Sequence, residues 1–527
     1  MNLAVLTVIV LLYLGILSLL AYIGYKQTKT VEDYMLAGRN ISPWIMAFSY
    51  GSTFISTSAI IGFGGMAAKF GFSLIWLAFL NIALGVWVAF AYLGTRIRRL
   101  SVKLNVSTLP SLLGARYQSK WITVVSGLSI FVFMPAYTSI ILIGGARFLQ
   151  EAMSMDFNTA LMILAVIVGV YVLTGGLKAV MYTDAFCSVI MFIGMIFLLI
   201  GTYKAVGGVI TGHKALTAMK ELVPQALTEA GHRGWTAMPS FGSPIWWTIV
   251  STIIMGVGIG VLAQPQLSIR FMTVKNDKDL YRSIVVGSIF LFFLVGTVYM
   301  VGPLTNVYFY ENTGMIAEDV AGGNVDLIIP AFISSFMPQW FLYLFTLTLL
   351  SAAISTLSSL MHVQGTAFGR DILDTLGFGN QNDNGKSSLT TQFGVIIGVI
   401  LAVILAYILP GSIIARATAF WFGICAAGFM PALLGALYWK RGTKYGAISS
   451  IVAGFAVSIF GFVFLHLAEA GPFGISMALF GRETLLPYPW THVDPLFYSL
   501  PVSFLVYVVV SMLTKPPTKS HLEQCFD

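Results

Sequence analysis

The sequence predicts an all-α polytopic membrane protein with about thirteen transmembrane helices, and two observations lead to this fold class. Hydrophobic residues make up 57% of the 527-residue chain and charged residues only 9%, whereas soluble domains carry about 25% charged residues. The apolar residues also gather in segments close to the roughly 20 residues that a helix needs to cross a bilayer. No soluble domain is therefore expected.

The apolar segments follow one another along nearly the whole chain. The first, Leu3–Ile23, has no cleavage site of small residues after it, so we expect a retained helix rather than a signal peptide. Residues 374–391 are predicted to form a polar loop rich in Gly and Asn. The twelve later segments, numbered here as spans one to twelve, are Trp44–Phe70, Phe72–Leu93, Trp121–Ala146, Ala160–Leu173, Ala185–Thr202, Ile245–Leu262, Ile284–Val301, Trp340–Gly365, Phe393–Leu409, Ala417–Leu437, Ile448–Leu467 and Tyr498–Leu513.

The distribution of basic residues predicts the orientation of the chain. If Met1 lies outside, 21 of the 29 Lys and Arg residues fall in cytoplasmic loops, Arg270 among them, while the acidic residues divide into 10 inside and 11 outside. The positive-inside rule counts cations and gives little weight to Asp and Glu. We therefore expect a multi-pass protein of the plasma (inner) membrane, with its N-terminus outside and its C-terminus in the cytoplasm.

Other classes of function find little support in the composition. The net charge of +8 is spread over the chain, so no basic domain for nucleic acid is expected. Cys187, Cys425 and Cys525 are an odd number of cysteines without metal-ligand spacing, and the six histidines show no such spacing either. We predict neither an enzyme nor a nucleic-acid-binding protein. A channel, or a sensor with the same fold, stays open as a weaker alternative.

Two of the predicted spans are interrupted by glycines. Freed backbone groups are tolerated in a membrane only where protein or a water-filled cavity receives them. Spans one and six lie five apart and run in opposite directions, which is the pattern of an inverted repeat with a site near the midplane. For span one alone, a continuous helix with close-packed small residues is the other interpretation. The interruptions are Gly51-Ser52-Thr53 with Gly62, Gly64 and Gly65 in span one, and Gly256-Val257-Gly258-Ile259-Gly260 with Gln264-Pro265-Gln266 in span six.

This symmetry predicts the organisation of the chain. An extra N-terminal helix occupies residues 1–30, and a cytoplasmic tail occupies residues 514–527. Between them we expect a first five-helix repeat in 44–205, a second in 245–437, and two C-terminal helices in 447–513.

Polar residues within spans mark candidate sites, because each of them is costly in a bilayer. Asp184 lies at the inner end of span five, where an interfacial aspartate stabilised by Lys178 or solvent is the alternative. In span eight, Ser355 and Thr356 place two hydroxyls side by side. Such hydroxyls often bond to their own helix. With carbonyls freed by a broken helix, they would also suit a cation such as Na⁺.

Four motifs together resemble the sodium:solute symporter family, which includes glucose, proline, sialic acid, pantothenate and monocarboxylate carriers. They are the segment Asp33–Arg39, the stretch TGGLKAVMYTD that ends at Asp184, AQPQLSIRFM at Ala263–Met272, and SAAISTLSS in span eight. The resemblance covers nearly the whole chain. It implies a leucine-transporter-like inverted repeat of five plus five helices, with helices one and six broken, and Na⁺-coupled symport by alternating access.

The resemblance also implies an ion site. In the family, the main sodium site uses two carbonyls from the break in helix one, and a carbonyl with two hydroxyls from helix eight. The family's aspartate in helix five matches Asp184, near which some members bind a second sodium. We therefore expect one Na⁺ site, with Asp184 beside it, and leave a second site open. The positions that match the main site are Ser52, Ile55, Ala352, Ser355 and Thr356.

A small organic carboxylate, of monocarboxylate or pantothenate type, is the expected substrate. The stretches Gly114–Trp121, Ile143–Glu151 and Val325–Phe332 are most similar to those branches. No buried Arg or Lys is evident in the spans, which favours a monocarboxylate over a dicarboxylate, and a half-helix N-terminus favours anions. The residues expected to form the cavity are Phe54, Ser56, Thr57, Tyr137 and Gln264.

Sodium-coupled carriers of amino acids such as proline, or of sugars, are the alternatives. They are disfavoured because side chains that sugar and proline carriers place in the cavity are absent here. We expect the monomer to be the functional unit in the lipid bilayer. The positions concerned are Phe54, Ala59, Val257 and Gly260 for sugars, and Phe54 and Gln266 for proline.

Overall fold

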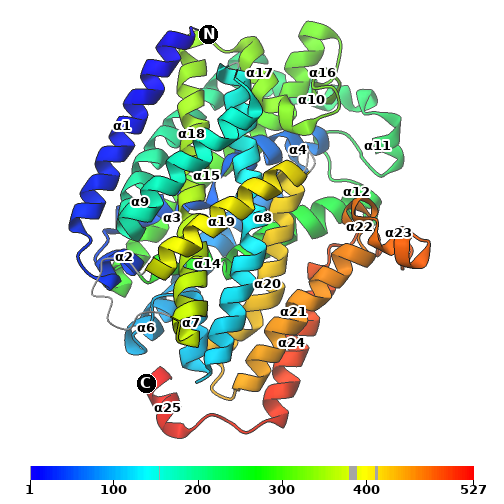
Figure 1. The fold of residues 1–527 in the computed structure, drawn as a ribbon. Coiled ribbons are helices and arrows are strands. Elements are labelled where there is room, and N and C mark those ends of the chain that lie inside the picture. The colour runs from blue at the N-terminus through cyan, green and yellow to red at the C-terminus, as the bar shows by residue number, and fades with distance from the viewer. Residues whose placement is uncertain (1, 154, 379–388, 410–413, 527) are drawn as a thin grey trace.

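The computed structural model is a bundle of long helices (Figure 1). It describes residues 2–153, 155–378, 389–409 and 414–526. Within these ranges, eleven helices are long and apolar enough to cross a membrane. The predicted all-α membrane fold is therefore confirmed. Most of the predicted polar loop 374–391 lies outside the described residues.

Both glycine-interrupted spans begin with the same local signal. The Ser42 side chain accepts a hydrogen bond from the Ile45 N–H, and Pro43 occupies the first helical position. Ser243 and Pro244 repeat this arrangement at the start of span six. A serine N-cap satisfies one unpaired N–H of the first turn, and proline there has no N–H to leave unpaired.

The five spans of the first predicted repeat form four helical segments, because spans four and five share one helix. Span one is divided into α3 (Pro43–Phe54), a π-helical turn η2 (Ser58–Gly62) and α4 (Phe63–Phe70). After a 3₁₀ turn, η3 (Gly71–Leu74), span two continues as α5 (Ile75–Ile82), η4 (Ala83–Gly94) and α6 (Thr95–Lys103). Helix α8 (Lys120–Met153) is span three, and α9 (Phe157–Ala205) contains spans four and five. Helix α9 is kinked at Gly176, where φ is 61° and Tyr34 packs against the backbone.

The second predicted repeat follows the same order. Span six comprises α12 (Pro244–Trp247), η6 (Thr248–Val257), α13 (Gly258–Gly260), η7 (Val261–Ala263) and, after a break, α14 (Pro265–Phe271). Spans seven to ten are α15 (Asp277–Thr313), α18 (Gln339–Thr366) with η9 (Ala367–Asp374), α19 (Leu389–Ile408) and α20 (Ile414–Tyr438). Helix α18 packs along α9 and α8, and α20 packs against η6.

The remaining helices surround this core. Helix α1 (Leu3–Gln27) lies against α9, and α21 (Lys444–Phe464) pairs with α24 (Leu496–Leu513). The N-terminus and the C-terminus lie at opposite ends of the bundle (Figure 1), as an odd number of spans requires. The shorter helices are α2 (Val31–Leu36), η1 (Ala37–Arg39), α7 (Leu109–Arg116), α10 (Val209–Ala218), η5 (Met219–Leu222), α11 (Gln225–Glu229), α16 (Ala317–Val320), η8 (Val325–Leu327), α17 (Ile328–Phe336), α22 (Leu467–Phe473), α23 (Ile475–Phe480) and α25 (Lys519–Phe526).

Two of the thirteen predicted spans do not appear as separate long helices. Span one is interrupted between α3 and η2, so neither part alone is long enough to cross a membrane. Span four forms only a short apolar stretch, Phe157–Val170, before the kink in α9. The other eleven predicted segments correspond to the eleven long helices.

Candidate ion and substrate site

The break in span one exposes backbone carbonyls to α18. Helix α3 ends when Ile55 takes an extended conformation, with φ −88° and ψ 95°, and the Ile55 N–H makes its bond to the Gly51 carbonyl. The Ser52 carbonyl, next along the chain, accepts hydrogen bonds from Ser355 Oγ at 3.0 Å and Thr356 Oγ1 at 3.4 Å. The continuous-helix interpretation of span one is therefore wrong.

The two hydroxyls on α18 have further partners. Ser355 Oγ also donates to the Ser351 carbonyl at 2.7 Å and lies 3.4 Å from the Ala352 carbonyl. Thr356 Oγ1 lies 3.2 Å from the Thr53 carbonyl. Four of the predicted ion ligands, from Ser52, Ala352, Ser355 and Thr356, thus lie in one hydrogen-bonded cluster, and Ile55 lies at the break itself. All the oxygens of this set are neutral and buried, which fits a small cation such as Na⁺.

A buried ion pair lies beside this cluster. Asp184 Oδ2 accepts from Arg270 Nη2 at 2.9 Å and from Ser49 Oγ at 2.7 Å, and both charged side chains are fully buried. Arg270 Nη2 also lies 2.5 Å from the hydroxyls of Thr53 and Ser359. The interfacial interpretation of Asp184 is wrong.

Two expectations about charged residues are also corrected here. Lys178, which was expected to stabilise Asp184, is paired with Asp33 instead. Arg270, counted in the sequence as a loop cation, lies inside the bundle on α14, so the expectation of no buried Arg or Lys was wrong. Because its charge is paired with Asp184, the buried cluster is close to neutral overall.

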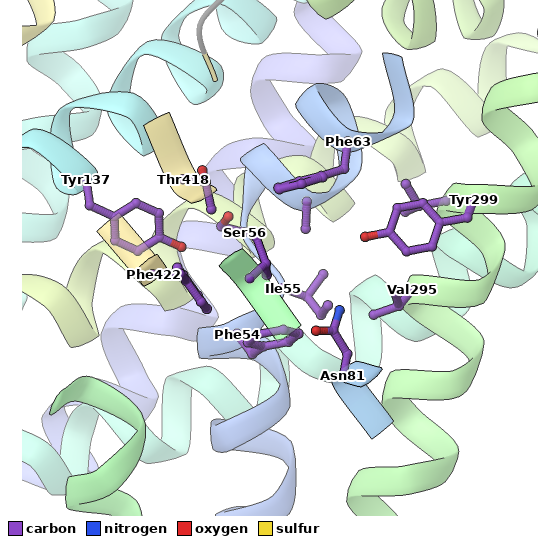
Figure 2. A pocket seen from close by; sticks show the side chains of 13 residues that line it. Phe54, Ile55, Ser56, Phe63, Asn81, Tyr137, Val295, Tyr299, Thr418 and Phe422 are labelled. Atoms are coloured by element: carbon purple, nitrogen blue, oxygen red, sulfur yellow. The ribbon is translucent and has the colours of Figure 1, made fainter. Parts of the chain in front are cut away.

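A pocket opens on the other side of the break (Figure 2). Its cavity volume is about 20 Å³, far below the roughly 300–1,000 Å³ usual for small-molecule sites, so the pocket is nearly closed in this conformation. Tyr137 and Tyr299 face it from opposite sides, and Asn81 reaches it from α5 (Figure 2). Among the described residues that line it, none is charged.

Comparisons with known proteins identify the family of the chain. Residues 34–454 match the profile of the sodium:solute symporter family. The chain belongs to this family. It is 27% identical over 438 residues to a sodium/pantothenate symporter of Haemophilus influenzae, covering 83% of this chain and 85% of that protein. It is 29% identical over 517 residues to a sodium/proline symporter of Staphylococcus aureus, covering 97% and 93%.

The fold is similar to that of a solved sodium-coupled symporter. A Na⁺-coupled sialic acid symporter, in a substrate-bound outward-open state, aligns with a TM-score of 0.75 at 18% identity and covers 98% of this chain and 99% of that one. The protein is thus a sodium-coupled solute symporter and not an enzyme.

The pocket contains three of the five side chains predicted for it. Phe54, Ser56 and Tyr137 line the pocket. Thr57 instead donates to the Ile141 carbonyl of α8 at 3.3 Å. Gln264 donates to the Gly260 carbonyl at 3.1 Å and is not part of the lining. Each of these side chains satisfies a backbone carbonyl instead, on the neighbouring helix α8 for Thr57 and in its own segment for Gln264.

Several lining residues of the symporter were not predicted. Asn81 on α5, Tyr299 on α15, and Thr418 and Phe422 on α20 belong to the pocket. Asn81 could have been found, because a single amide within the apolar span two is an intramembrane polar residue. The others carry no such signal, since a Tyr or Phe in an apolar span is usual.

Proposed function

We propose that this symporter carries a small organic monocarboxylate together with one Na⁺. The ion lies between the break in span one and α18, and the solute lies in the pocket beyond Phe54. The observation that carries the proposal is that the hydroxyls of Ser355 and Thr356 meet the Ser52 carbonyl beside an uncharged pocket.

The hydroxyls can receive a cation without losing all their hydrogen bonds. Ser355 can keep donating to the Ser351 carbonyl, and Thr356 can keep donating to the Thr53 carbonyl. Each hydroxyl oxygen then has a lone pair for the ion, and the Ser52 carbonyl becomes available as a ligand. With the carbonyls of Ile55 and Ala352, this makes five neutral oxygen ligands.

The pairing of Asp184 supports a single ion. Asp184 Oδ1 has no hydrogen-bond partner among the described residues, but a second Na⁺ bound there would lie close to the Arg270 guanidinium, whose like charge would repel it. We propose that Asp184 acts as a positioning residue instead, holding the Ser49 and Thr53 hydroxyls on the inner side of the break. A measured transport ratio of two Na⁺ per solute would overturn this assignment.

The lining of the pocket supports a monocarboxylate. Arg270 is already paired with Asp184, so it is not available to bind a second carboxylate of the solute. One negative charge on the solute would be balanced by the co-bound Na⁺, while Asn81, Tyr137 and Tyr299 supply hydrogen-bond donors. Proline also carries an ammonium group, and no carboxylate among the described lining residues would pair with it.

Uptake by the purified protein in proteoliposomes tests the proposal. Radiolabelled lactate, pyruvate and pantothenate are compared with proline and glucose, each with an inward Na⁺ gradient and with K⁺ in its place. We expect uptake of at least one carboxylate that requires Na⁺ and is competed by the others. Na⁺-driven uptake of proline or glucose alone would refute the carboxylate while leaving Na⁺ coupling in place.

We also propose that the N-terminus lies outside, the C-terminus lies in the cytoplasm, and the monomer transports. The count of basic residues supports this orientation. A protease site added to the C-terminus should be cut in inside-out vesicles and resist cleavage in right-side-out vesicles. The opposite result would reverse the orientation. Single-molecule counting of labelled protein in active liposomes tests whether a single copy of the chain is sufficient for transport.

A further inference from the structure

A basic pocket lies at the end of the bundle that carries the C-terminus. Arg96, Arg99 and Lys103 line it from α6, where their spacing of three and four residues puts them on one helix face. The end of α20 and Phe526 of α25 close its other sides. The cavity between these elements has a volume of about 350 Å³.

The positive charge of this pocket is only partly balanced. Asp277 accepts from Arg99 at 2.6 Å, but it is shared with Arg98 at 2.9 Å. Within the described ranges, Arg96 and Lys103 take part in no ion pair. The pocket therefore attracts anions.

One arginine of the pocket lining, Arg96, is held in place by the protein. Arg96 Nη1 donates to the Leu437 carbonyl at 3.0 Å, and its guanidinium lies 4.2 Å from the centre of the Tyr438 ring. A guanidinium that is fixed in this way loses little conformational freedom when it binds a phosphate. The remaining N–H groups of Arg96 can then donate to phosphate oxygens.

Aromatic side chains indicate where the pocket lies relative to the membrane. Tyr438 donates through its hydroxyl to the Tyr92 carbonyl at 2.8 Å, and the two side chains are 43% and 64% exposed. Tyrosines exposed at the ends of spans are typical of the level of the lipid head groups. Arg96 is stacked on Tyr438, so the basic pocket lies at that level.

We propose that this pocket binds the phosphate head group of an anionic phospholipid, with Arg96 and Lys103 as its main ligands. Basic pockets between transmembrane helices on the cytoplasmic side commonly bind such head groups, and the predicted orientation places this pocket on that side. The bound lipid would link α6, α20 and the C-terminal helix α25. The proposal does not depend on the identity of the transported solute.

Lipid binding to the full-length protein tests the proposal. Native mass spectrometry in detergent measures the affinity for phosphatidylglycerol and for phosphatidylcholine. We expect phosphatidylglycerol to bind at least tenfold more weakly to the Arg96→Gln/Lys103→Gln variant than to the wild type. The matched control is Lys278→Gln/Lys444→Gln, which removes the same charge from exposed positions of the same end outside the pocket lining and should bind like the wild type.

Three outcomes would overturn the proposal. They are equal affinity of the pocket variant and the control, equal affinity for the two lipids, and a thermal stabilisation by millimolar inorganic phosphate that matches that by phosphatidylglycerol. The last result would make this a site for a soluble anion. If the double variant does not fold, Lys103→Gln alone should weaken phosphatidylglycerol binding about threefold, because Lys103 is exposed and supports no neighbour among the described residues.

Discussion

The two broken helices start alike, but the backbone carbonyls at their breaks have different hydrogen-bond partners. At the break in span one, the Ser52 carbonyl is met by hydroxyls from another helix, α18. At the break in span six, the Gln264 side chain donates to the Gly260 carbonyl four residues before it, and the Gln266 side chain donates to Gln264 Oε1. A break that is satisfied by its own segment offers no ligands, whereas a break that depends on a neighbouring helix can bind an ion between the two.

The second half of span six contributes to the first break in another way. Helix α14 carries Arg270, which reaches Asp184 and the hydroxyls of Ser49 and Thr53 on the inner side of span one. One broken helix thus supplies carbonyls, and the other supplies a paired charge. Variants at each of the two breaks test these separate roles, and the largest effect is expected at the buried ion pair.

Removing one member of the buried ion pair should have the largest effect. Asp184→Asn leaves the Arg270 charge unpaired in a dry site, which costs roughly 3–5 kcal/mol of stability. Arg270→Gln should cost a similar amount. The double variant Asp184→Asn/Arg270→Gln should lose less than the sum of the two, because neither charge is then unpaired.

Denaturation in detergent measures these losses. Glu32→Gln is the control, since it removes the pair between Arg39 and the 54% exposed Glu32 side chain, and exposed pairs contribute about 0–1 kcal/mol. Additive losses in the double variant would show that Asp184 and Arg270 do not support each other.

Thr356→Ala should weaken Na⁺ binding roughly tenfold. Hydrogen bonds to charged groups are worth about 1.5–3 kcal/mol, and each 1.4 kcal/mol is about tenfold in affinity. Solute affinity should fall at limiting Na⁺ and recover at saturating Na⁺, because coupling between two ligands is reciprocal.

Na⁺-dependent uptake and isothermal titration measure both affinities. The Thr348 hydroxyl donates to the Leu344 carbonyl of its own helix, so Thr348→Ala should keep the wild-type Na⁺ affinity. Equal weakening of solute binding by Thr356→Ala at every Na⁺ concentration would make Thr356 a solute ligand or a packing residue.

Gln264→Leu should change transport much less. It removes the hydrogen bond to the Gly260 carbonyl, with an expected loss of about 0.5–1.5 kcal/mol in stability. The Na⁺ affinity should stay within about threefold of the wild type, because the second break is completed by its own side chains. A tenfold loss of Na⁺ or solute affinity would show that Gln264 binds one of them.

The smallest expected effect is a dependence on pH of the stability of the loop that contains His232, which contacts the far end of span one. His232 Nε2 lies 3.1 Å from the Lys69 carbonyl, and His232 Nδ1 accepts from the Gly234 N–H at 3.1 Å. This arrangement requires the neutral imidazole, and burial, with the nearby Lys69 charge, lowers the pKa of His232 although the Lys69 carbonyl opposes the shift.

Because the unfolded loop takes up the proton at a higher pH than the folded loop, its stability should fall as the pH drops below about 6.5. Hydrogen exchange of residues 219–240 at pH 7.5 and pH 5 measures this change. His232→Gln should remove the pH dependence, and an unchanged pH dependence in that variant would assign it to another group.

Local sequence features predicted much of the fold. Hydropathy located the eleven long helices of the described ranges, and Gly and Pro located both breaks. The adjacent hydroxyls of Ser355 and Thr356 pointed to the place on α18 where the Ser52 carbonyl is met. Each of these features depends on a few neighbouring residues, so it can be recognised without the rest of the chain.

The burial of Arg270 could not be predicted from its neighbours in the sequence. In the sequence, Arg270 follows a proline and an amide near the end of a span, and it was counted among the loop cations. In the structure, it is fully buried, because Asp184, 86 residues earlier in the chain, offers a partner for its charge. Thr57 and Gln264 were assigned to the pocket for the same reason: hydroxyl and amide side chains near a break can face either a solute or a backbone carbonyl.

By itself, the sequence determined that the protein spans a membrane and where its helices break, because hydropathy and backbone preferences act over one or two helical turns. Only the tertiary structure decided which carbonyl meets which hydroxyl, that the pocket has an uncharged lining, and that Asp184 is paired rather than free. These outcomes depend on contacts between segments far apart in the chain. A buried polar group takes whichever partner the folded chain brings within hydrogen-bond distance.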